Sequence, residues 1–226
     1  MNTYSCGNGH IDLADRLGIA TAASLAVPGS CNSRIIRTTL KDSYSTNDKT
    51  LYVIGLSFLA RGEIPIGNDR DSLEGRWLST LHFQFPKNKV MPYFTESEVE
   101  RFVELKIKTE MYSVEDLLEQ LMYQLLSMIN DLLHRGHQVL VFRNPEDTYN
   151  HCLDHTEFTQ LKKCVNIIDG LAWSAILWQI EQGIKFVPGD VKHPPGIRHP
   201  MPREHNPLNN FLSEYIKEHA LYLPVL

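Results

Sequence analysis

The run LYVIGLS, at residues 51–57, is a near-continuous apolar segment with the length of one β-strand. Strands that are buried on both faces of a parallel sheet have this composition. A second segment of the same kind, QVLVF, follows at residues 138–142. Helical patterns stand before, between and after these two runs, and such alternation is typical of right-handed βαβ units. The sequence therefore predicts an α/β fold built on a mostly parallel sheet.

The strongest helical pattern covers residues 114–133, whose apolar side chains fall on one helix face, and Gly136 is expected to end that helix. Asn32 or Ser33 is expected to cap a helix that continues through Leu40. Weaker patterns predict helices at residues 11–17, 95–108, 156–163, 172–182 and 207–219, and short strands at residues 2–5, 20–27 and 165–168. Residues 58–94 show no strong period and are expected to form a long irregular insertion.

Composition restricts the classes of function. With 226 residues, 42% of them hydrophobic, the chain can form one domain with a full core. The net charge of -5 provides no basic surface for nucleic acid, and no apolar run reaches the roughly 18 residues of a membrane span. The sequence shows no signal-peptide pattern, and its four cysteines have no CxxC spacing. We therefore expect a cytoplasmic protein with reduced thiols that binds neither nucleic acid nor a membrane.

In a parallel sheet, ligands bind at the carboxyl ends of the strands. The segments expected at that edge are residues 7–10, 28–34 and 57–63 and the loop before the last helix. In the second of them, Gly29 can offer a backbone N–H and Asn32 an amide donor, and such donors suit a developing oxyanion. The alternative, which spacing alone favours, is an ordinary turn between a strand and a helix with a residue that caps the helix.

Three histidines, His193, His199 and His205, lie in the loop that precedes the last helix. A histidine can act as a general base when a carboxylate orients it, and Asp190 stands three residues before His193. The six-residue spacing of the histidines is not a recognised metal-ligand pattern, so we expect no metal. We expect no nucleotide cofactor either, because no phosphate-binding glycine loop is present. The alternative is that these are loop histidines without a role.

Arg61 and Glu63 follow the first apolar run. Such a pair can orient a substrate or a neighbouring helix beside a binding site. The alternative is an exposed ion pair, which contributes little to stability.

Taken together, these segments resemble the SGNH/GDSL hydrolase superfamily, and most of all the short SGNH-like proteins encoded by tailed phages, including phages of cyanobacteria. The matching segments stand in the order of the family and span nearly the whole chain. They are GNGH at 7–10 with DLADRLG at 12–18, PGSCNSRIIRTTL at 28–40, YVIGLSFLARGE at 52–63, and RHPMPREH with LNNFLSEYI at 198–216. The resemblance implies one flavodoxin-like domain, residues 1–226, with three layers (α/β/α) around a central, mostly parallel sheet.

In that family the first segment ends in Gly-Asp-Ser, and its serine attacks an ester. Gly7-Asn8-Gly9 matches this position, so Gly9 stands where the serine is expected. Gly29 matches the glycine whose N–H lines the oxyanion hole. The family's asparagine after the third strand has no counterpart in Gly55-Leu56-Ser57, and Asn32 is the candidate to replace it.

The last family segment is Asp-x-x-His before the final helix. His199 matches its histidine, and His205 matches a frequent second histidine, whereas the position of the aspartate falls on Gly196. Asp190 and His193 satisfy the written pattern but stand farther from the final helix. The resemblance therefore implies a site that keeps its histidine and loses both the serine and the usual aspartate.

The leading functional hypothesis is a degenerate SGNH-hydrolase-like protein that keeps the site but lacks the nucleophile. It would have a binding, structural or accessory role in the host cytoplasm or in a phage virion, with virion or homo-oligomer partners. The alternative is a divergent esterase or acetyl-ester hydrolase acting on carbohydrate or lipid esters. In that case His199 is the base, Gly29 and Asn32 form the oxyanion hole, and Cys6 or Ser5 is the nucleophile. A nucleotide-handling α/β protein is a third, weaker alternative.

Overall fold

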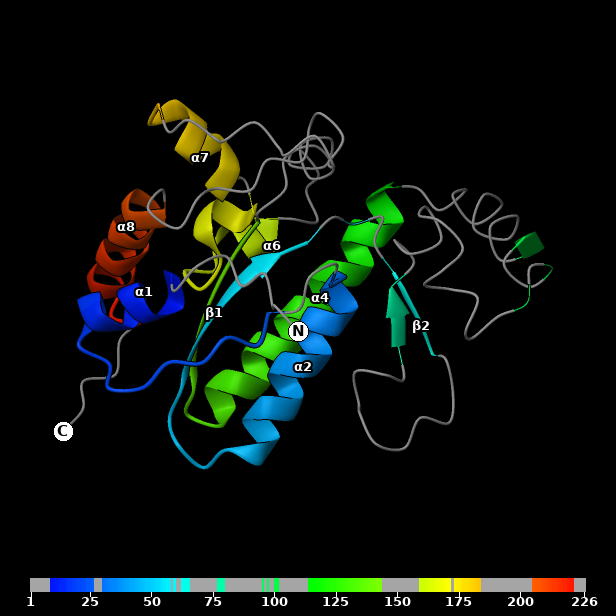
Figure 1. Ribbon diagram of the computed structural model, residues 1–226, viewed down its shortest axis with the longest axis horizontal. Helices are drawn as coiled ribbons and strands as arrows, with labels where there is room; N and C mark the ends of the chain where they lie inside the picture. Colours follow the sequence, from blue (N-terminus) through cyan, green and yellow to red (C-terminus); the bar gives the residue numbers. More distant parts are fainter. Residues whose placement is uncertain are drawn as a thin grey trace.

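The computed structural model describes part of the chain, and the structural statements below concern that part. The described residues are 9–26, 30–57, 59, 62–65, 77–79, 95, 97, 100–101, 114–143, 159–171, 173–183 and 205–221. Strands β1 (Leu51–Leu56) and β4 (Gln138–Arg143) pair in parallel, with Leu51 opposite Gln138 and Leu56 opposite Arg143. The two apolar runs of the sequence therefore form neighbouring parallel strands, as predicted (Figure 1).

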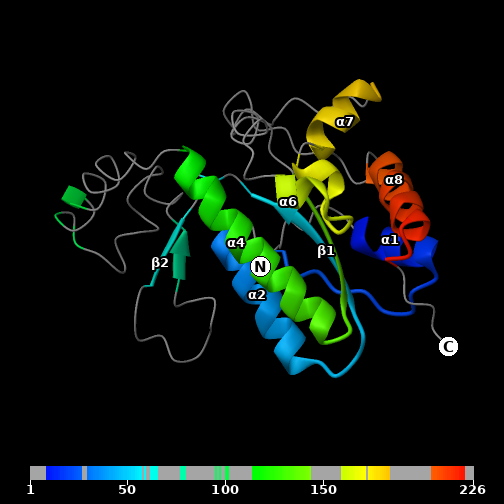
Figure 2. The ribbon, with the colours of Figure 1, turned by 180° about the vertical axis from the view of Figure 1, so that it is seen from behind.

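The pair of strands has a different core on each face. Alternate residues of β1 and β4, among them Ile54 and Val141, pack with helices α2 (Asn32–Ser45) and α4 (Val114–His134). The residues between them, such as Val53 and Leu140, pack with α1 (Gly9–Leu17) and α8 (His205–Glu218). Figures 1 and 2 show these two helix pairs on opposite sides of the strands. The chain is thus an α/β protein with helices on both faces of a parallel strand pair.

Helix α4 confirms the strongest helical prediction. Its buried face includes Leu125 and Leu132, both 0% exposed, because apolar residues three and four positions apart fall on one side of a helix. The helix ends where predicted, since Gly136 has a φ of 81°, a left-handed conformation that suits glycine. Gly18 follows α1 in the same conformation, with a φ of 69°.

Two isolated parallel bridges continue the sheet next to β4. They join Val141 to Ile167 and Arg143 to Ser174. The strand predicted at residues 165–168 is therefore reduced to one bridged residue, because the chain turns at once into the 3-10 helix η4 (Ile168–Leu171). Within that turn Asp169 has a φ of 47°, which no extended strand can contain.

The strand predicted at residues 20–27 is wrong for the described residues 20–26, which form no strand and are exposed. This stretch consists largely of Ala, Ser and Thr, so it has little apolar surface to bury against a helix layer. Alanine also has a low preference for strands. The predicted cap of α2 is wrong as well: Cys31 is the N-cap, and its Sγ accepts a hydrogen bond from the Arg34 N–H at 3.4 Å.

The remaining described elements are short. The predicted insertion at 58–94 contains β2 (Glu63–Pro65) and β3 (Trp77–Ser79), which pair antiparallel. Helix α7 (Ala175–Glu181) is shorter than predicted, and α6 (Thr159–Lys162) lies within the helix predicted at 156–163, whose first three residues are outside the described part. After Thr95, residues 97, 100 and 101 are helical. None of the helices in the described ranges is both long and apolar enough to cross a membrane.

Candidate functional site

Helix α8 begins near the carboxyl ends of β1 and β4. The Phe211 ring, in its second turn, stacks on the Trp173 ring, with centroids 4.7 Å apart. Trp173 in turn contacts Phe142, the penultimate residue of β4, with centroids 5.7 Å apart. Figure 1 shows α8 running from this edge toward the opposite end of the strands. The start of α8 therefore lies at the edge where parallel sheets bind ligands.

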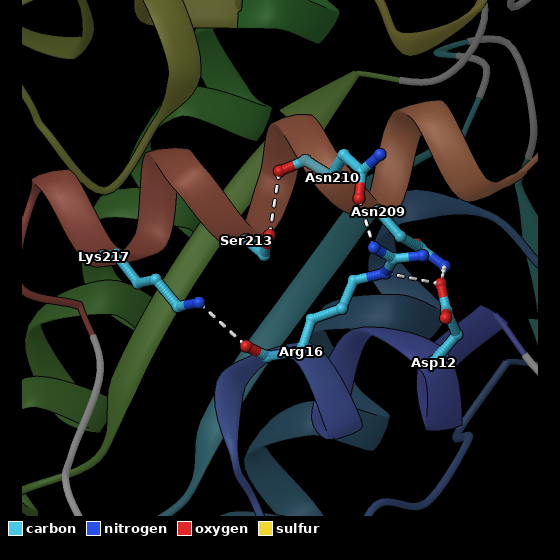
Figure 3. Close-up of polar contacts among 6 residues, drawn as sticks. All are labelled: Asp12, Arg16, Asn209, Asn210, Ser213 and Lys217. Atoms are coloured by element: carbon cyan, nitrogen blue, oxygen red, sulfur yellow. Dashed lines mark hydrogen bonds and ion pairs between the residues drawn. The ribbon is translucent and has the colours of Figure 1, made fainter.

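Helix α1 packs against α8 and crosses it (Figures 1 and 2). Near the start of both helices, Asn209 Nδ2 donates to Asp12 Oδ2 at 2.8 Å. Near their ends, Lys217 Nζ donates to the Arg16 carbonyl oxygen, also at 2.8 Å (Figure 3). The first residues of the two helices, Gly9 and His205, stand three and four residues before the contact of Asp12 with Asn209.

Asp12 is the centre of the polar contacts between these helices. Its Oδ2 also accepts a hydrogen bond from Arg16 Nε at 2.8 Å, and the Arg16 guanidinium continues to the Asn210 side chain (Figure 3). The hydrogen bonds from Arg16 and Asn209 hold the pKa of the Asp12 carboxyl below its usual value, because they favour its charged form. Asn209 is 5% exposed, whereas the Asp12 side chain is 37% exposed, so the contact is shielded from water on the side of α8 only.

Asp12 predicts an acid dependence of stability. A carboxyl whose pKa is lowered by folding stabilises the protein above the unfolded-state value of about 4, and this stabilisation is lost as the pH falls through the lowered pKa. We expect Asp12→Asn to be less stable than the wild type near neutral pH, with the difference shrinking below about pH 4. Urea unfolding over that range measures it. A difference that stays constant with pH would contradict the assigned contacts.

Asn32 joins the start of α2 to the carboxyl end of β1. Its Oδ1 accepts a hydrogen bond from the Ser57 N–H at 2.7 Å, and its Nδ2 donates to the Ser57 carbonyl at 3.2 Å. Asn32 is 6% exposed and Ser57 is 8% exposed. This pair of bonds brings two of the predicted segments, 28–34 and 57–63, together at one edge.

Glu63, on β2, has a partner on α2. Both of its carboxylate oxygens accept hydrogen bonds from the Arg37 guanidinium, one of them from Nη2 at 3.0 Å. Arg37 lies on α2, and the Glu63 side chain is only 4% exposed. The contact therefore fixes β2 against α2, whereas Arg61 lies outside the described residues.

Cys31, beside Asn32, is a structural thiol. It is 1% exposed, and burial raises the pKa of its thiol. Since the thiolate is the nucleophilic form, this cysteine is suited to capping α2 and not to attacking a substrate.

Most of the predicted catalytic residues lie outside the described residues. They are Ser5, Cys6, Asn8, Gly29, Asp190, His193 and His199. Gly9 and His205 are the first residues of α1 and α8. Asn32 contacts Ser57, and Glu63 contacts Arg37. Among the described residues, no group of three His, Cys, Asp or Glu side chains could hold a metal ion.

Several buried polar residues near this edge were not predicted. Arg143, the last residue of β4, is 1% exposed, and Ser174, bridged to it, is 3% exposed. Gln179 on α7 is 1% exposed, and its Nε2 has no hydrogen-bond partner within the described part of the chain. The sequence gives one indication of these residues: Arg143 directly follows an apolar run, which places it at the carboxyl end of a predicted strand. Asp12 and Asn209 gave no signal, because their contact joins residues far apart in the chain.

No family model, no curated protein and no solved structure matches this chain. What the protein does must therefore be inferred from its own residues and contacts.

Proposed function

We propose that the protein is a degenerate SGNH-hydrolase-like protein that keeps the ligand site of that superfamily and lacks its serine nucleophile. It binds a small ester or a carbohydrate without cleaving it, as an accessory protein of a tailed phage. The observation that carries the proposal is the packing of α1 against α8, in which Asp12 meets Asn209 near the start of both helices. It supports a shared site for the turn before α1 and the histidine loop before α8.

The architecture supports the same proposal. Cores on both faces of β1 and β4 are what a three-layer α/β/α fold of flavodoxin type requires. In such a fold the ligand site lies at the carboxyl edge of the sheet. The Asn32–Ser57 bonds hold the start of α2 at that edge, and helix starts carry partial positive charge. Carbonyl and carboxylate oxygens are therefore the ligand groups that this edge favours.

The proposed chemistry is binding through an incomplete catalytic set. Gly29 is the proposed backbone donor to the ligand's carbonyl oxygen, and His199 is the proposed base. Asn32, whose amide is bonded to Ser57, holds the start of α2 beside them. Gly9 has no side chain that can attack, so the ligand leaves unchanged. Removing the nucleophile of a triad generally costs several orders of magnitude in rate.

The test is to supply the missing nucleophile with Gly9→Ser. Position 9 is the first residue of α1, and α/β hydrolases commonly place the nucleophilic serine at such a turn into a helix. We expect hydrolysis of p-nitrophenyl acetate to rise at least about 100-fold over the wild type, since a positioned general base alone contributes about 10²–10⁴. Labelling by a fluorophosphonate should appear with it.

Two variants serve as controls. Gly9→Ala makes the same change to the backbone without a hydroxyl and should give no gain, and His199→Ala should abolish the gain of Gly9→Ser. A folded Gly9→Ser protein with no activity would overturn the proposal. Labelling of the wild type that disappears in Cys6→Ala or Ser5→Ala would establish the esterase alternative instead.

A further inference from the structure

We draw no further inference here: the strongest candidate, the cluster of buried polar side chains of Arg143, Ser174 and Gln179 near the carboxyl edge of the sheet, carries none, because Arg143 and Ser174 already have partners and nothing in the described part of the chain shows what group the Gln179 Nε2 would bind.

Discussion

Leu132→Ala is expected to lower the free energy of unfolding by about 2–5 kcal/mol. Leu132 is 0% exposed and belongs to the core that α4 forms with β1 and β4. Truncation there removes buried methyl groups and leaves a cavity, because a close-packed interior relaxes only in part. Urea or guanidinium unfolding, with equal slopes for variant and wild type, measures the change.

The next residue provides a matched control. Leu133 has the same side chain on the same helix but is 38% exposed. Leu133→Ala should cost less than about 1 kcal/mol, since exposed substitutions are usually within about half a kcal/mol of neutral. Equal losses for the two variants would mean that α4 does not present the assigned face to the sheet.

This pair of neighbours also shows what the sequence could predict. The face of α4 follows from the spacing of its apolar residues, and β1 and β4 follow from two apolar runs bounded by polar residues. These signals are local, and each is long enough to outweigh the weak preferences of single residues. The α/β class was therefore predictable from a few segments.

Elements that depend on a partner were not predictable in the same way. Residues 20–26 have the length of a strand but make no strand pairing in the structure. The cap of α2 went to Cys31 because the Asn32 side chain is engaged with Ser57. In both cases a tertiary contact, or its absence, decided the outcome over local preference.

In the candidate site as well, some features follow from local sequence patterns and others depend on contacts between distant residues. That segments 28–34 and 57–63 meet was predictable, since both follow from the rule that loops gather at the carboxyl edge of a parallel sheet. The contact of Asp12 with Asn209 spans 197 residues, and its side chains match no local motif. Likewise, Glu63 pairs with Arg37, which lies 26 residues away in the chain. Partner choice between distant polar residues requires the structure.

Asn32→Leu tests the junction on which the edge depends. Leucine has nearly the size of asparagine but can neither accept from the Ser57 N–H nor donate to its carbonyl. The Ser57 N–H and carbonyl are buried, and each loses its hydrogen bond to residue 32. Leaving a buried donor or acceptor without that bond costs about 1–3 kcal/mol. We expect the free energy of unfolding to fall by about 2–4 kcal/mol, measured by urea unfolding.

Two further variants separate the lost hydrogen bonds from a general effect on α2. Ser33→Ala changes the next, exposed residue of the same helix and should be close to neutral. Asn32→Asp keeps an acceptor for the Ser57 N–H but turns a carboxylate oxygen toward the Ser57 carbonyl, so near neutral pH it should also be destabilised. Protonation of that carboxyl supplies a donor again, so the loss in Asn32→Asp should shrink in acid while that in Asn32→Leu does not. If Asn32→Leu is as stable as the wild type, the two hydrogen bonds to Ser57 contribute nothing to stability. Packing alone would then hold the start of α2 at the strand end, and the Asn32 amide could exchange Ser57 for a ligand without loss of stability.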